Sequence, residues 1–191
     1  MDNLLPYDGE ALYWKSVFSS TLSNNCYTNL MNEINWKHDE LTMFGRHIVT
    51  KRMVAWYGDQ ALAYKYSNKT KIAMLWTPEL SLIKEKVELV TGHKYNSCLL
   101  NLYHNGEEGM GWHSDNEKQL KENGAIASVS FGASRKFTMK HKATKEKISL
   151  ELDSGSLLLM RGSIQKHWLH SLPLSKKIKE ARINLTFRTI I

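Results

Sequence analysis

The part of the chain that follows Asn96 consists of short segments rich in β-branched and aromatic residues, with turn residues between them. This texture is typical of β-strands. We expect strands at residues 97–103, 110–115, 125–132, 136–142, 147–153, 155–161, 166–172 and 181–190. About eight strands behind a helical N-terminal part predict an α+β fold that is mostly β, a double-stranded β-helix or jelly roll like that of the cupins.

The N-terminal part carries the pattern of two helices. Residues 8–36 are expected to be mainly helical, because apolar residues recur four positions apart and would share a buried face. These residues are Leu22, Cys26, Leu30 and Ile34. A second helix should begin at Thr77-Pro78-Glu79, which offers an N-cap, a proline and an acid, and end at Gly92. Its expected apolar stripe is Leu82, Ile83, Val87 and Val90. Between the helices, residues 41–66 predict short strands or hairpins.

Length and charge limit the classes of protein that fit. A chain of 191 residues predicts one domain, and the absence of any run of 18 apolar residues predicts no membrane span. The N-terminus lacks the pattern of a secretory signal, and two isolated cysteines favour a reducing, intracellular compartment. A net charge of +7 favours a polyanionic partner such as nucleic acid. The alternative is a surface that is simply basic.

The segment 111–117 contains a candidate metal site. His113 and Asp115 are two residues apart, so in a strand their side chains point to the same face. With one more histidine they would form the two-histidine, one-carboxylate set that binds non-haem Fe(II). His167 and His170 are candidates for the third ligand, and alternation in a strand allows only one of them to face inward without saying which. The alternative is that the H-x-D pattern binds no metal.

The last predicted strand alternates cleanly. Three apolar residues share one face, and the other face is polar; its residues are Arg182, Asn184, Thr186 and Arg188. One interpretation is an antiparallel strand with one face in water. The other is a site in which two arginines grip a small dicarboxylate, because arginine binds carboxylates through two hydrogen bonds. Asn101 and Tyr103 share a face of an earlier strand and could donate to the same ligand.

Together these motifs resemble the AlkB family of Fe(II)/2-oxoglutarate dioxygenases, and in particular its branch with human AlkB homologue 2. The resemblance covers residues 41–191, and its most specific element is the segment 182–188. The motifs that carry it are Asn101-Leu102-Tyr103, His113-Ser114-Asp115, residues 126–132, residues 155–160, His170 and residues 182–188.

The resemblance implies a role for individual residues. His113, Asp115 and His170 would bind Fe(II), and 2-oxoglutarate would be held by Asn101, Tyr103, Arg182, Asn184 and Arg188. The substrate base would meet Tyr64, Tyr66, Ser67 and Glu117. Nucleic acid would contact Phe44, Gly45, Arg46, Arg52 and Arg135. Residues 1–40 would be an N-terminal arm and helix, residues 41–76 a nucleotide-recognition region, and residues 96–191 the jelly-roll core.

The resemblance also implies a reaction. With Fe(II), 2-oxoglutarate and O2, the protein would demethylate 1-methyladenine and 3-methylcytosine in DNA, releasing formaldehyde, succinate and CO2. The alternatives are an RNA demethylase, another hydroxylase of the same fold, or a noncatalytic nucleic-acid-binding module. We expect a monomer without a membrane partner. It should lie in the cytoplasm at the nucleoid if its source is bacterial, and in the nucleus if its source is eukaryotic.

Overall fold

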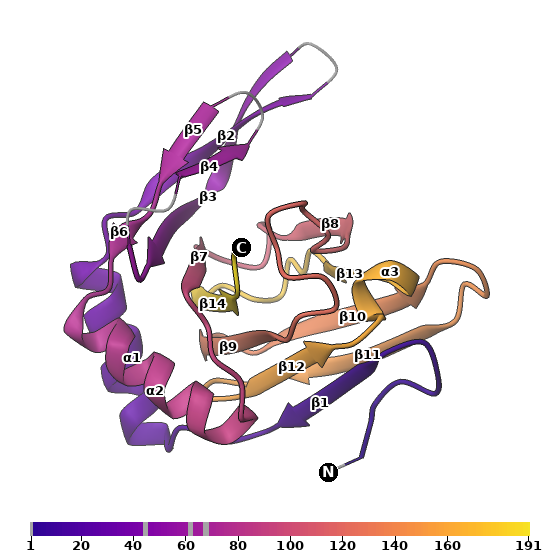
Figure 1. Cartoon of the computed structure of the whole chain (residues 1–191). Helices are drawn as coiled ribbons and strands as arrows, with labels where there is room; N and C mark the ends of the chain where they lie inside the picture. The colour runs from indigo at the N-terminus through magenta and orange to yellow at the C-terminus, as the bar shows by residue number, and fades with distance from the viewer. Residues whose placement is uncertain (1, 44–45, 61–62, 67–68) are drawn as a thin grey trace.

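A computed structural model describes residues 2–43, 46–60, 63–66 and 69–191 of the chain (Figure 1). The larger sheet contains β1 (Glu10–Trp14), β2 (Lys37–Met43), β3 (Arg46–Gly58), β6 (Met74–Leu75), β7 (Ser97–Tyr103), β9 (Ile126–Gly132), β12 (Leu157–Arg161) and β14 (Arg182–Arg188). Their order is β1-β12-β9-β14-β7-β3-β2, with β6 paired to β3. The smaller sheet contains β8 (Met110–His113), β10 (Arg135–His141), β11 (Lys147–Leu152) and β13 (Trp168–Leu172), in the order β11-β10-β13-β8.

The two sheets confirm the predicted fold class. Each of the eight strands expected after Asn96 is present, and β7 has the predicted bounds. One boundary was wrong at the segment 166–172. His167 ends the short helix α3 (Ile164–His167), and β13 begins only at Trp168. The two candidate histidines therefore do not alternate along one strand, and only His170 lies in β13.

Two long helices cover the outer face of the larger sheet (Figure 1). In α1 (Ser20–Glu33), the side chain of Ser19 caps the N-terminus by accepting a hydrogen bond from the Leu22 amide. In α2 (Pro78–Thr91), Thr77 is the N-cap and Gly92 ends the helix in the left-handed conformation, as predicted. Two expected core residues are instead in solvent: Leu22 is 45% exposed and Leu82 is 64% exposed.

The prediction of helix from residue 8 was also wrong, because residues 10–14 form β1. This strand pairs with β12, and Ala11 is fully buried by the pairing. The conformation of Gly9 allows the chain to pass close to Ile164 immediately before β1 begins. Its φ is +136°, and a Cβ atom at this position would lie 2.7 Å from the Cα atom of Ile164. A tertiary contact therefore decides the conformation of this segment.

The apolar core is divided by the larger sheet. One cluster lies between this sheet and α1 and α2, and it includes Leu100, Leu102 and Leu185. The second cluster lies between the two sheets and includes Tyr103, Met139 and Trp168. Since neighbouring residues of a strand point to opposite faces, β7 and β14 turn their leucines to the helices and their polar residues to the smaller sheet.

Two hairpins extend from one end of the jelly roll (Figure 1). One is formed by β2 and β3, and the other by β4 (Ala63–Tyr66) and β5 (Lys69–Ile72). They confirm the expectation of hairpins in residues 41–66. Within the described residues, no helix has the length and apolar character needed to cross a membrane.

Candidate iron and 2-oxoglutarate site

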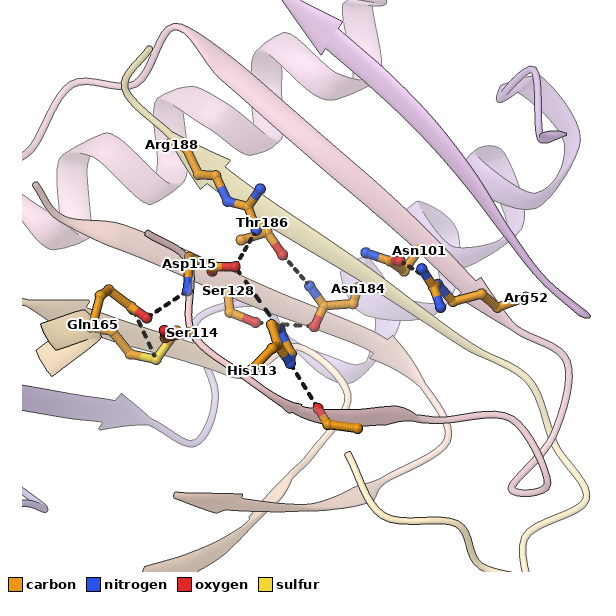
Figure 2. A network of polar contacts seen from close by, with 12 residues as sticks. Arg52, Asn101, His113, Ser114, Asp115, Ser128, Gln165, Asn184, Thr186 and Arg188 are labelled. Carbon is orange, nitrogen blue, oxygen red and sulfur yellow. Dashed lines mark hydrogen bonds and ion pairs between the residues drawn. The ribbon is translucent and has the colours of Figure 1, made fainter. Parts of the chain in front are cut away.

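His113, Asp115 and His170 meet between the two sheets. His113 ends β8 and pairs with His170 in the middle of β13, and Asp115 follows two residues after β8. One ligand atom from each of the three residues lies within 4.8 Å of the others. The Nε2 atom of His113 is 4.0 Å from Oδ1 of Asp115, and the two imidazole rings are 4.2 Å apart between centroids. The three candidate ligands from sequence thus form one compact cluster. Figure 2 shows His113 and Asp115 of this cluster.

The protonation of this cluster suits a metal ion. Nδ1 of His113 lies 2.8 Å from the Gly111 carbonyl oxygen. A carbonyl only accepts, so Nδ1 carries the proton and the Nε2 lone pair is available to a metal. Burial, opposed by the charge of Asp115, lowers the pKa of His170 to about 4, which keeps this ring neutral at pH 7. Two imidazoles and a carboxylate fit Fe(II).

Asp115 is fixed from two sides. Gln165 accepts a hydrogen bond from the Asp115 amide at 2.9 Å, and Nη2 of Arg188 donates to Oδ1 of Asp115 at 2.8 Å (Figure 2). Burial alone would raise the pKa of Asp115, but the charge of Arg188, aided by His170, outweighs it and the pKa is lowered. The carboxylate is therefore ionised at neutral pH. Sequence reasoning missed Gln165, since no motif marks it.

The polar faces of β7 and β14 lie side by side next to this cluster. Asn101 pairs with Asn184, and Tyr103 pairs with Arg182. This face is enclosed between the sheets and not in water: Arg182 is 1% exposed and Tyr103 is 4% exposed. The arrangement excludes the interpretation of β14 as a strand with one solvated face. The dicarboxylate site stays a prediction with which this enclosed face is compatible.

Arg182 is a buried cation whose hydrogen-bond partners are neutral. Its Nη2 atom donates to Ser130 Oγ at 2.9 Å and to Asn184 Oδ1 at 2.7 Å, while its Nε atom has no hydrogen-bond partner. Burial lowers the pKa of Arg182 to about 10, so it stays charged at pH 7. A buried charge normally has a counter-ion. A carboxylate of 2-oxoglutarate would supply it, and this is the observation by which the residues present fit that co-substrate.

Serine and threonine hydroxyls complete a polar wall around Arg182, which consists of Asn184, Thr186, Ser128 and Ser130. Ser128 donates to Asn184 at 3.1 Å, and Asn184 donates to Thr186 at 2.9 Å (Figure 2). The alternation of β9 places Ser128 and Ser130 on the face of the arginines. The sequence could have indicated these serines through that alternation.

Two of the residues predicted to contact nucleic acid lie elsewhere. Arg135 is 1% exposed, and its guanidinium donates to the carbonyls of Asn105, Glu108 and Pro173. This side chain is structural, and its prediction as a nucleic-acid contact was wrong. The Arg52 side chain is 14% exposed and points to Asn101 instead of to solvent.

The remaining predicted contacts are only partly described. Phe44, Gly45 and Ser67 lie outside the described residues, as do the side chains of Arg46, Tyr64 and Tyr66. Glu117 is half-buried, and one of its carboxylate oxygens is enclosed without a hydrogen-bond partner. It lines a cavity of about 440 Å³ together with Asp115 and Arg188. The predicted base contact at Glu117 thus adjoins the iron ligands.

Comparison with known proteins agrees with this geometry. The family model of the 2OG-Fe(II) oxygenase superfamily matches residues 10–188. The human protein named DNA oxidative demethylase ALKBH2 is 37% identical over 186 residues, which cover 92% of this chain and 71% of that protein. The chain belongs to the AlkB family of 2OG-Fe(II) oxygenases.

Other members of the AlkB family show similar agreement. The bovine ALKBH2 protein is 37% identical over 92% of this chain and 67% of its own length. Human alkB homolog 3, named an alpha-ketoglutarate-dependent dioxygenase, is 42% identical over 73% of this chain and 51% of that protein. The solved structure of OsALKBH1 superposes with a TM-score of 0.65, at 14% identity, over 94% of this chain and 97% of that one, which supports the fold. The AlkB-family protein is therefore an Fe(II)/2-oxoglutarate-dependent dioxygenase.

Proposed function

We propose that this dioxygenase is an oxidative demethylase that repairs N-alkylated bases in DNA, with 1-methyladenine and 3-methylcytosine as substrates. The observation that carries the proposal is the His113, Asp115 and His170 cluster beside the buried Arg182, in a chain similar to DNA oxidative demethylases over most of its length. The net charge of +7 supports a polyanionic substrate, because cations that neutralise phosphates release counter-ions.

Different residues would bind the iron and the 2-oxoglutarate. Fe(II), 2-oxoglutarate and O2, when bound, supply the oxidation of an N-methyl group to a hydroxymethyl group, with succinate and CO2 as products. His113, Asp115 and His170 would hold the iron. Arg182 and Arg188 would hold the carboxylates of 2-oxoglutarate, with Asn101, Tyr103 and Asn184 beside them. The hydroxymethyl group would then leave the base nitrogen as formaldehyde and release its hydroxyl proton, so that the nitrogen regains its lone pair and the base its pairing edge.

The methyl group lies on the Watson–Crick edge, so the base must leave the helix before it reaches the iron. A lesion that blocks pairing lowers the cost of this flipping. We propose that Tyr64 and Tyr66 stack on the flipped base, which is worth about 1–3 kcal/mol per base, and that Ser67 and Glu117 contact its polar atoms. Phe44 and Gly45, which lie between β2 and β3 in the sequence, would fill the gap, with Arg46 on a phosphate.

The test is formaldehyde release from oligonucleotides that carry one 1-methyladenine or 3-methylcytosine. DNA and RNA, single- and double-stranded, should be compared at equal concentration with Fe(II) and 2-oxoglutarate. We expect release from DNA, and a loss of at least about 100-fold for His113→Ala because one iron ligand is removed. The control His104→Ala changes an exposed histidine outside the cluster and should keep full activity. Activity only on RNA would replace DNA as the substrate, and activity that survives in His113→Ala would refute the iron site.

We further propose that the protein acts as a monomer, because the cluster and the polar wall are completed within one chain. A DNA substrate places it in the nucleus of a eukaryote or at the nucleoid of a bacterium. Light scattering of the purified protein checks the first statement, and imaging of the tagged protein in its source cell checks the second.

A further inference from the structure

The β2–β3 hairpin contains a β-bulge near the polar face of β7 and β14, where 2-oxoglutarate is proposed to bind. His38 pairs with Met53, but Glu40 pairs with Val49, so Asp39 alone spans the three residues 50–52 of the opposite strand. Bulges bend a strand and redirect its side chains, and they are frequent next to active sites. Here the bulge separates the outer part of the hairpin from the part of β3 that pairs with β7. Arg52 lies at this junction.

Arg52 joins a residue of the hairpin to a residue of the co-substrate face. Its Nη2 atom donates to Asp39 Oδ2 at 2.9 Å, and its Nε atom donates to Asn101 Oδ1 at 3.2 Å. Figure 2 shows Arg52 beside Asn101. The side chains of Arg52 and Asp39 are 14% and 7% exposed. The charge of Asp39 neutralises Arg52, so Arg52 adds little positive charge to the site. Its effect must come mainly from where its N–H groups point.

The hydrogen bond from Arg52 determines which way the Asn101 amide faces. A guanidinium N–H can only donate, so the atom of Asn101 that it meets must be the oxygen. The amide nitrogen of Asn101 is then left to donate toward the enclosed polar face. Val54 pairs with Asn101, and Arg52 lies two residues before Val54, so Arg52 and Asn101 share that face. An amide donor suits a carboxylate or keto oxygen, whereas the opposite orientation would repel one.

We propose that Arg52 is a positioning residue that couples the β2–β3 hairpin to 2-oxoglutarate binding. It holds Asn101 in the orientation that donates to the co-substrate, and Asp39 in the bulge holds Arg52. A movement of the β2–β3 hairpin when nucleic acid binds to it would thus change the affinity of the protein for 2-oxoglutarate. The inference rests on the proposed function in taking Asn101 as a 2-oxoglutarate contact and nucleic acid as the ligand of the hairpin.

The first test measures 2-oxoglutarate affinity without catalysis. Mn(II)-loaded protein is titrated with 2-oxoglutarate by calorimetry, in the absence of nucleic acid. Arg52→Gln should weaken binding about 10-fold, as expected when one charge-assisted contact no longer orients its partner. Asp39→Asn should weaken it about 3-fold, because Arg52 keeps its bond to Asn101. The control Lys51→Gln removes the same charge from the neighbouring exposed residue and should bind like the wild type. Equal Mn(II) affinity in all variants shows that the iron cluster is intact.

The second test measures coupling. An unmodified oligonucleotide at saturation should change the 2-oxoglutarate affinity of the wild type by about 5-fold or more, which is the lower end of typical coupling between sites. Arg52→Gln should lose this change while it binds the oligonucleotide as the wild type does. If Arg52→Gln loses oligonucleotide affinity and keeps 2-oxoglutarate affinity, Arg52 is a nucleic-acid contact and the inference is overturned. A wild type that binds no oligonucleotide would refute the proposed function and the coupling, while the first test would still decide whether Arg52 positions Asn101.

Discussion

At the scale of single residues, Arg182 shows how the protein reserves a place for its co-substrate. A guanidinium buried against Ser130, Asn184 and the ring of Tyr103 is costly, because none of these neighbours carries a negative charge. The protein bears this cost in the absence of ligand. Under the proposed assignment, the carboxylate of 2-oxoglutarate would find a desolvated partner already fixed in place, so the cost of orienting that partner would be met during folding.

Removal of this charge should therefore separate stability from binding. Arg182→Met keeps the length of the side chain, so we expect the ligand-free protein to unfold at the same temperature or higher. Affinity for 2-oxoglutarate should fall at least about 100-fold, in line with the loss of a buried charge pair. Thermal unfolding and calorimetry of Mn(II)-loaded protein measure both. The control Arg161→Met removes an arginine that pairs with Glu10 on β1, and its 2-oxoglutarate affinity should not change. Binding by Arg182→Met within about 3-fold of the wild type would contradict the assignment.

At the scale of elements, the alternation of polar and apolar residues made the strands after Asn96 predictable. Features that depend on tertiary contacts, such as β1, were not predictable in this way. The period of two along β7 and β14 correctly placed leucines on one face and Asn101 and Arg182 on the other. Four-residue spacing indicated α1, and capping residues indicated α2. The apolar faces expected for these helices nevertheless included Leu22 and Leu82, since some apolar side chains remain in solvent. The first strand carried no such signal, because its pairing with β12 joins residues about 150 positions apart.

The glycine that leads into β1 offers a test of this tertiary control. Gly9→Ala would place a methyl group against the backbone of Ile164 at a φ that side chains rarely adopt. We expect a loss of about 3 kcal/mol in the free energy of unfolding, measured by urea titration. The matched control is Gly92→Ala, where φ is +71° but no atom lies within 4 Å of the added Cβ. That variant should lose only about 1 kcal/mol. Equal losses in the free energy of unfolding for the two variants would show that the contact with Ile164 does not contribute to stability.

At the scale of the whole molecule, long side chains were the least predictable part of the site. Arg52 and Arg135 are basic residues in strands, and the sequence could not say whether either faces solvent or the interior. The order of strands decided this, by placing Arg52 on the same face as Asn101, within hydrogen-bond distance of it, and Arg135 near three carbonyl groups. The choice between His167 and His170 likewise needed either the fold or the resemblance. The pairing of His113 with Asp115 was predicted from alternation alone, although β8 ends at His113 and Asp115 lies two residues beyond it.

The net charge of +7 predicts how binding to nucleic acid responds to salt. Lys140 lies on the outer face of the smaller sheet, 4.3 Å above the ring of the exposed Trp112, and is placed to meet a phosphate. Each phosphate contact contributes about one unit to the slope of log affinity against log salt concentration. We expect Lys140→Gln to reduce the slope by about 1 in anaerobic binding to a single-stranded oligonucleotide, measured by fluorescence anisotropy. Lys86→Gln, which removes an equal charge from the exposed side of α2, should leave the slope unchanged. If both variants shift the slope equally, the charge acts as a general field, and the outer face of the smaller sheet makes no specific contact.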